Sequence, residues 1–185
     1  MPTKLILIRH GETAWSSQKR YCGISDVELN ENGRKQALLL AGKLSGERVD
    51  KIYSSDRKRT WQFARIVFPG LPVEKVPELQ EINFGIFEGF TYRQILKTHP
   101  EIYRAWLANP VDTQIPGGES LSNLAERVKK ILEKILADNR NKTIAVVTHS
   151  GPIRIILGGI RKLELKNIWQ IKPDLASVNI VEFNG

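Results

Sequence analysis

The chain has 185 residues, of which 41% are hydrophobic and 26% are charged, and this balance predicts one globular domain over residues 1–185. It contains no apolar run long enough for a membrane span or a secretory signal, so we expect a cytoplasmic protein without a membrane partner. The formal net charge is +8, but Lys and Arg are scattered rather than clustered, which favours a small anionic ligand over nucleic acid.

The first predicted strand, residues 5–8, is wholly aliphatic and runs directly into Arg9-His10-Gly11. A short apolar run of this kind is typical of a strand that is buried on both faces in a parallel sheet. A polar stretch with turn formers follows over residues 14–27. Asn30 is the expected N-cap of a helix that ends near Gly46.

The middle of the chain contains a strand at 51–55, a helix at about 56–67 that stops before Pro69-Gly70, and a candidate strand at 73–76. Residues 78–89 carry three Glu, two Gly and two Phe without helical period, so we expect an ordered loop. Two short helices, 92–98 and 101–108, are separated by Pro100, and residues 109–118 are expected to form a loop.

A clean 3.6-residue apolar stripe predicts a long helix from Leu121 to Leu136, with Ser120 as its cap. Residues 143–147 form another apolar run, which ends in Thr148-His149-Ser150-Gly151. Pro152 suits the first turn of a helix to about 157, and the alternating residues 177–183 suit a final edge strand. This order of elements predicts a three-layer α/β/α sandwich with a mostly parallel sheet.

The carboxyl ends of parallel strands meet at one edge of a sheet, and ligands bind there. Arg9-His10 and His149 follow two such strands, so they are expected to share one site although they are far apart in sequence. Arg offers a planar fork of donors for a phosphate, and imidazole acts as a nucleophile or as an acid/base near neutral pH. Taken alone, the Arg-His pair is equally compatible with a solvated strand end.

Six motifs in order make the chain resemble the histidine phosphatase superfamily of phosphoglycerate mutase-like proteins. They begin with Leu-Ile-Arg-His-Gly-Glu-Thr, and the Arg20 to Gly23 block with Leu29-Asn30 follows. The next are Tyr-Ser-Ser-Asp with Arg59, and Glu81 to Gly85 with Glu88-Gly89. The last two are Pro-Gly-Gly-Glu-Ser and Val-Val-Thr-His-Ser-Gly. Together they cover residues 4–160, nearly the whole chain.

The resemblance implies a metal-independent phosphomonoesterase that needs no cofactor and acts on a small phosphorylated substrate. His10 would attack phosphorus, with its other ring nitrogen donating to a backbone carbonyl. Arg9, Arg59 and His149, the last as a cation, would surround the transferring phosphoryl group. Glu81 would protonate the leaving group, although Glu78 and Glu88 compete for that role. Ser16, Gly23 and Ser150 are further candidate substrate-binding residues.

Within this superfamily the size and the Arg-Tyr-Cys-Gly block are most similar to the alpha-ribazole phosphatases of cobalamin synthesis. Broad-specificity phosphatases share nearly the same motifs. The compact 89–118 segment favours a phosphatase over a phosphoglycerate mutase, which carries extra sequence there. Ser16 departs from the Asn that is common in the family, so its contact with phosphate is open.

Several alternatives and side issues stay open at this stage. A silent phospholigand-binding module is a non-enzymatic alternative, and a homodimer remains open as well. The lone Cys22 excludes an internal disulfide and a cysteine-based zinc site, and we interpret it as a packing residue. No His-x-x-x-His pair offers a preformed metal site.

Overall fold

The structure is a computed structural model that describes residues 2–183. Its five strands form one sheet in the order β3-β2-β4-β1-β5. Their bounds are β1 Thr3–Arg9, β2 Lys51–Ser54, β3 Val73–Lys75, β4 Thr143–Thr148 and β5 Val178–Phe183. The first four pair in parallel, and β5 pairs with β1 in the antiparallel direction at the edge. The mostly parallel sheet and the final edge strand are thus confirmed.

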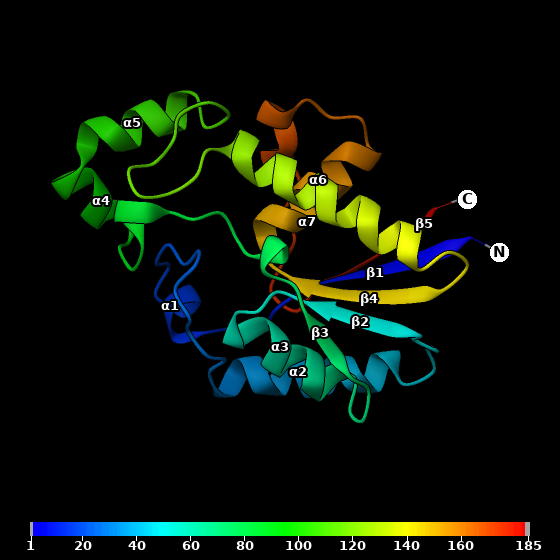
Figure 1. Cartoon of the computed structure of the whole chain (residues 1–185). Coiled ribbons are helices and arrows are strands. Elements are labelled where there is room, and N and C mark those ends of the chain that lie inside the picture. The colour runs from blue at the N-terminus through cyan, green and yellow to red at the C-terminus, as the bar shows by residue number, and fades with distance from the viewer. Residues whose placement is uncertain (1, 184–185) are drawn as a thin grey trace.

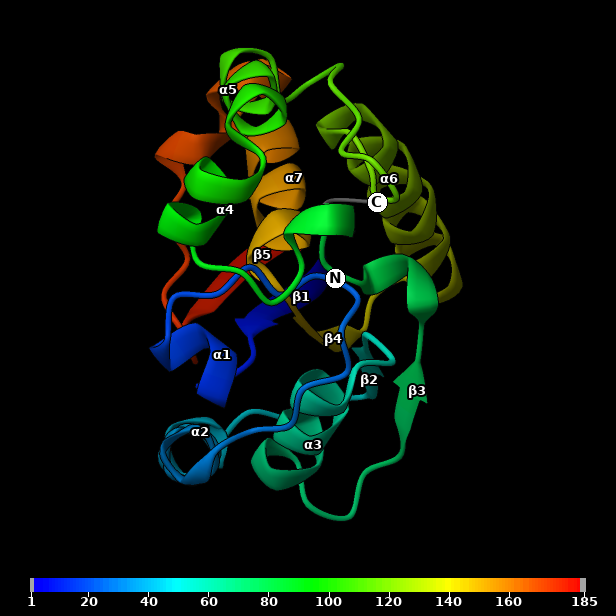
Figure 2. The same ribbon diagram turned by 90° about the vertical axis from the view of Figure 1, so that its left-hand side faces the viewer.

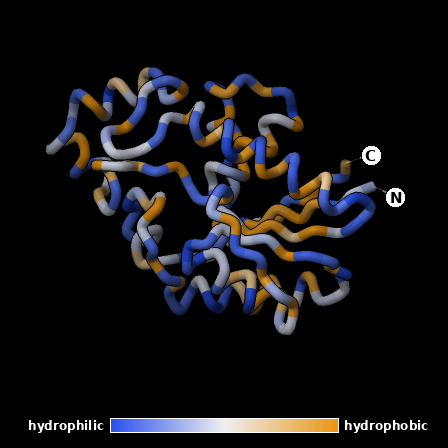
Figure 3. Tube along the Cα trace, viewed as in Figure 1, coloured by the Kyte–Doolittle hydropathy of each residue, from blue (hydrophilic) through white to orange (hydrophobic). Residues whose placement is uncertain are grey.

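The two central strands, β1 and β4, explain why the sheet is buried on both faces. Leu5 and Leu7 of β1 belong to one apolar cluster, whereas Ile6 and Ile8 belong to another on the opposite face. Residues 144–147 of β4 alternate between the same two clusters. Successive side chains of a strand point to opposite faces, so an unbroken aliphatic run fills both cores. Figure 3 shows these strands as the most hydrophobic part of the trace.

Helices cover both faces of the sheet, as Figures 1 and 2 show. On one face lie α2 (Glu31–Leu44) and α3 (Lys58–Val67), which supply the apolar side chains of one cluster. On the other face lie α6 (Leu121–Asp138) and α7 (Ser150–Ile160). The predicted three-layer α/β/α sandwich is therefore confirmed.

A third apolar cluster lies outside these layers, beneath α4 (Tyr92–Thr98) and α5 (Pro100–Ala108). Its buried members are largely aromatic, and they are Phe87, Ile95, Tyr103, Trp106 and Ile115. In Figure 1 these two helices stand away from the sheet, on the side toward which the parallel strands point. The cluster gives this outlying segment a core of its own, so it forms a firm wall beyond the strand ends.

Some local elements differ from the sequence-based prediction. The polar stretch after β1 contains a short helix, α1 (Ala14–Ser17), which Thr13 caps in a capping box with Ser16. Two single 3₁₀ turns, Pro77–Leu79 and Gly85–Phe87, give shape to the predicted loop at 78–89, and a third spans Leu165–Gln170. Helix α7 begins at Ser150 with Pro152 in its first turn, as predicted, but it ends at Ile160 rather than at about 157. Within residues 2–183, the helices are all too short or too polar to span a bilayer.

Candidate active site

A cleft of about 460 Å³ opens beyond the carboxyl ends of the central strands. Its walls combine the β1 end with α1, the 78–89 segment and the start of α7. The lining residues are Arg9, His10, Thr13, Ser16, Lys19, Arg20, Tyr21, Cys22, Arg59, Glu81, Phe84, Tyr92, Ser150 and Arg154. Four of the five residues predicted from the sequence as catalytic, all but His149, are therefore brought together around one cavity.

His10 follows β1, and its backbone amide donates to the carbonyl of Thr148 on β4. In the ring, Nδ1 lies 2.7 Å from the carbonyl oxygen of Gly11. A carbonyl only accepts, so Nδ1 carries the proton and Nε2 keeps its lone pair. Burial, helped by the charges of Arg59 and Arg9, holds the pKa of His10 well below its ordinary value. The expected ring orientation is present, and Nε2 is unprotonated at neutral pH.

His149 follows β4 and packs edge-on against His10, with 5.1 Å between the ring centroids. Its Nδ1 accepts from Nε of Arg59 at 3.2 Å, and its Nε2 faces the Ser55 hydroxyl at 3.0 Å. An Nδ1 that accepts a hydrogen bond carries no proton, and burial first, then the charge of Arg59, lowers the pKa of His149. The expectation of a cationic His149 is therefore wrong for this arrangement, in which the ring is neutral and lies behind His10.

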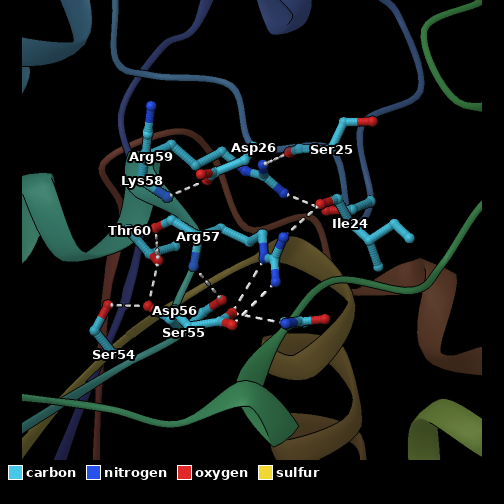
Figure 4. A network of polar contacts seen from close by, with 12 residues as sticks. Ile24, Ser25, Asp26, Ser54, Ser55, Asp56, Arg57, Lys58, Arg59 and Thr60 are labelled. Carbon is cyan, nitrogen blue, oxygen red and sulfur yellow. Dashed lines mark hydrogen bonds and ion pairs between the residues drawn. The ribbon is translucent and has the colours of Figure 1, made fainter.

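Arg59, in the first turn of α3, is almost fully buried, with 1% of its surface exposed. Its guanidinium donates to the carbonyls of Ser25 at 2.7 Å and Gly23 at 2.6 Å, besides His149. Figure 4 shows the start of α3 held against the 24–26 segment. There Arg57 donates to the Ile24 carbonyl and the Lys58 amide donates to Asp26. Arg59 thus fixes the loop that carries the cleft wall while its positive charge remains close to His10.

Arg9, the last residue of β1, also lines the cleft. Its Nη1 donates to the Pro173 carbonyl at 2.7 Å, and its buried Nε has no hydrogen-bond partner among the described residues. A buried N–H group without a partner is costly unless an acceptor is bound. Arg9 is therefore poised to bind an anion in the cleft.

Glu81 is 8% exposed and reaches the cleft from the 78–89 segment. The Gly151 amide, in the first turn of α7, donates to both carboxyl oxygens at 2.9 and 3.1 Å. A Cβ at Gly151 would collide with this carboxyl group, so the close approach requires glycine at that position. Glu81 is thereby held at the same sheet edge as His10.

The two other candidate acids lie outside the cleft. Glu88 accepts hydrogen bonds from the amides of Gly23, Ile24, Ser25 and Phe84 and from the Ser25 hydroxyl. It therefore ties the 23–25 loop to the 78–89 segment. Glu78 is exposed at the far end of that segment, where its carbonyl accepts from a guanidinium. Of the three carboxylates, Glu81 alone lines the cleft.

Arg127 of α6 clamps the backbone on which Glu81 sits. Its guanidinium donates to the carbonyls of Glu78, Gln80 and Glu81 at 2.8–2.9 Å. The same group forms a two-armed ion pair with Glu119, whose carboxylate also accepts from the Asn83 amide. The backbone on both sides of Glu81 is thus tied to one arginine–carboxylate pair. Sequence reasoning missed this role, because Arg127 lies on a helix whose apolar stripe predicted packing alone.

The candidate substrate-binding residues take different positions. Ser150 and Ser16 both line the cleft, although the Ser16 hydroxyl is engaged with the backbone of Thr13. Gly23 is not part of the wall, because its amide donates to Glu88 and its carbonyl accepts from Arg59. Cys22 lines the cleft in its stead. Burial raises the pKa of the Cys22 thiol to about 11. The prediction for Gly23 is corrected, since its role is to let two loops approach closely.

Three lining residues are neither candidate site residues nor members of the six motifs, namely Lys19, Tyr92 and Arg154. Arg154 follows Ser150 by four positions on α7, so the two side chains share a helix face. That spacing is a signal by which Arg154 was detectable from sequence. Lys19 and Tyr92 carried no such signal, because the loop conformation alone brings them to the cleft.

The model of the histidine phosphatase superfamily, branch 1, matches residues 5–185. The chain therefore belongs to the histidine phosphatase superfamily, and it is a phosphatase that acts on small phosphate esters.

Individual relatives agree with this class. Phosphoserine phosphatase 1 of Hydrogenobacter thermophilus is 37% identical over 180 residues, which cover 96% of this chain and 85% of that protein. A metal-independent phosphoserine phosphatase of Arabidopsis thaliana is 37% identical over 184 residues, covering 97% and 76%. The crystal structure of a putative alpha-ribazole-5'-P phosphatase from Escherichia coli superposes with a TM-score of 0.94 at 27% identity, covering 100% and 92%.

The two buried neutral histidines predict a pH dependence of stability. Both pKa values are lowered in the folded chain, so below about pH 6.5 the unfolded chain binds more protons than the folded one. The free energy of unfolding should then fall with decreasing pH, by up to about 1.4 kcal/mol per pH unit for each histidine. Urea unfolding of the wild type and of His10→Gln between pH 7.5 and 5 measures this slope. An equal slope in the two proteins would contradict the interpretation.

Proposed function

We propose that the protein hydrolyses phosphomonoesters without a metal, through a phosphohistidine formed at His10. The supporting observation is the Nδ1 contact with Gly11, which leaves Nε2 unprotonated in a cleft that also contains Arg9 and Arg59. In the first step Nε2 bonds to phosphorus and the ester P–O bond breaks, while the Glu81 carboxyl gives its proton to the departing alkoxide. In the second step the Glu81 carboxylate takes a proton from water, which attacks phosphorus and displaces His10.

The arginines supply the electrostatic part of this mechanism. A transferring phosphoryl group spreads negative charge over its oxygens, so fixed donors around it lower the barrier. Arg59 is buried, Arg9 is half-buried, and both are anchored to backbone carbonyls, so their positions are fixed before substrate binds. His149 acts through Arg59 and His10, which it contacts, rather than as a cation on the phosphate.

Two substrates are proposed for this site. Phosphoserine is supported by the names of relatives that are 37% identical over nearly the whole chain. Alpha-ribazole 5'-phosphate is supported by the Arg-Tyr-Cys-Gly block and by the likeness to the Escherichia coli structure. A screen of phosphate esters that includes both compounds, with a bisphosphorylated glycerate primer to detect mutase activity, ranks them.

The nucleophile is tested by turnover of a generic aryl phosphate in excess chelator. The wild type should hydrolyse it, and His10→Ala should lose at least about 10³-fold in kcat, because no other side chain replaces the nucleophile. His99→Ala, which removes a histidine outside the cleft wall, is the matched control and should stay active. Alkaline quench and mass spectrometry should detect phosphate on His10. Equal activity of His10→Ala, or no turnover by the wild type, would overturn the proposal.

The acid is tested by the dependence on the leaving group. Glu81→Gln should lower kcat/KM for an alkyl phosphate by about 10²–10⁴-fold, because an alkoxide needs a proton to depart. For a nitrophenyl phosphate, whose phenolate leaves unaided, kcat/KM should change by less than about tenfold. The phosphoenzyme should accumulate in this variant, since the base of the second step is missing. Equal losses with both esters would assign the proton to another group.

Arg127 is expected to act through Glu81 as a positioning residue, because it binds the backbone on which Glu81 sits. Arg127→Met should lower kcat/KM for the alkyl phosphate by about tenfold or more, and for the nitrophenyl phosphate much less, since misplaced acid catalysis matters only for the poorer leaving group. Lys130→Met, an exposed change on the same helix, is the control. A loss of the same size with both esters would instead indicate general damage to the fold.

A further inference from the structure

The charge of the cleft exceeds what a phosphate group alone requires. Its lining includes five basic side chains and one carboxylate, namely Arg9, Lys19, Arg20, Arg59, Arg154 and Glu81. A phosphomonoester brings a charge of about −1.5 to −2 at neutral pH. The bound substrate would thus leave unpaired positive charge in a partly buried cleft, which is unfavourable unless further negative charge is bound as well.

Among the described residues, Arg154 is the one arginine of the cleft whose two Nη groups are both without a hydrogen bond. Its Nε donates to the Ile171 carbonyl at 2.8 Å, and its guanidinium lies over the Trp169 ring, 5.1 Å from the centroid. Neither Nη group of Arg154 makes a hydrogen bond with residues 2–183, whereas Arg59 donates from all three of its guanidinium nitrogens. Arg154 is therefore held in place along one edge and presents its free edge for a ligand.

The position of Arg154 on α7 indicates which part of a substrate it meets. The charges that depress the pKa of His10 are those of Arg59 and Arg9. Gly151, whose amide donates to both carboxyl oxygens of Glu81, precedes Arg154 by three positions on α7, so the two residues share a helix face. Arg9 and Arg59 thus surround the nucleophile, while Arg154 lies toward the acid. In the proposed reaction the acid marks the side of the leaving group, so Arg154 faces the alcohol part of the ester.

We propose that Arg154 is a specificity-determining residue that binds a carboxylate on the alcohol part of the substrate. The fork of its two Nη groups matches the two oxygens of a carboxylate. The substrate class is then a phosphorylated small organic acid, rather than an ester whose phosphate is the sole anionic group. Of the two substrates proposed above, phosphoserine meets this requirement and alpha-ribazole 5'-phosphate does not. This inference rests on the proposed phosphatase mechanism.

The test compares substrates that differ by the carboxylate. O-phosphoethanolamine is phosphoserine without its carboxylate, and glycerol 3-phosphate replaces the carboxylate of 3-phosphoglycerate by a hydroxymethyl group. The wild type should favour the acid of each pair in kcat/KM. Arg154→Gln should lower kcat/KM for both acids by roughly 10- to 100-fold, mainly through KM, and should change the values for the two carboxylate-free esters by less than about threefold.

Two further variants sharpen the comparison. Arg154→Lys keeps the charge but loses the fork and the Nε contact with Ile171, so it should retain part of the preference for acids. Arg161→Gln removes the same charge from an exposed position at the end of α7, and it should behave like the wild type. The carboxylate-free esters serve as an internal check of folding, since a damaged cleft would lose activity toward them as well.

The outcomes separate this inference from the proposed function. If Arg154→Gln loses the acids and the carboxylate-free esters equally, Arg154 binds the phosphate or supports the fold, and the carboxylate site is refuted. If the variant keeps the full preference for acids, the site is refuted as well. A wild type that hydrolyses aryl phosphate through His10 but shows no preference for acids refutes the carboxylate site alone. Activity that is independent of His10 refutes the proposed function itself.

Discussion

The site depends first on the parallel pairing of β1 with β4. Arg9 pairs in register with Thr148, and the His10 amide donates to the Thr148 carbonyl, so the chain leaves both strands at the same level. This register places the rings of His10 and His149 in contact although 138 residues separate them in the chain. A shift by one residue would turn each side chain to the opposite face of the sheet and would separate the two rings. The apolar alternation of both strands opposes such a shift, because it would expose one core and crowd the other.

Buried and half-buried charges hold the loops beyond the sheet, in addition to the apolar packing of Leu79, Ile82 and Phe87. Arg59 binds carbonyls of the 23–25 loop, Glu88 binds its amides, and Arg127 with Glu119 holds the 78–89 segment. Charges that are withdrawn from water are costly without partners, and here Arg59, Glu88 and Arg127 are each met by several backbone dipoles. The result is a rigid cleft whose positive charges have already lost much of their water. Such preorganised charge stabilises a phosphoryl transition state better than mobile surface side chains would.

The same burial decides the state of the histidines. In water an imidazole titrates near pH 6.5, but His10 and His149 lie beside Arg59 and away from solvent. Both are therefore neutral, which suits a nucleophile and removes the cationic role that we expected for His149. The positive charge that the site needs is carried by the arginines. Residue type alone indicated an ionisable pair, whereas the neighbours determined which member of the site is charged.

The layers of the fold, the strand ends that carry Arg9, His10 and His149, and the family were all predictable from the amino-acid sequence. Apolar periodicity and short motifs are local properties of the chain, so they can be recognised before the chain is folded. The sequence also identified Arg59 and Glu81, through motifs that resemble those of a known family. The sequence did not reveal that Arg127 binds the backbone carbonyls around Glu81, or that Cys22 rather than Gly23 lines the cleft. It also did not reveal that the two Nη groups of Arg154 are left without hydrogen bonds to the described residues. These depend on how loops that are distant in sequence fold over the sheet edge. They become visible in the folded chain alone, since hydrogen-bond partners, burial and pKa shifts arise from contacts between segments.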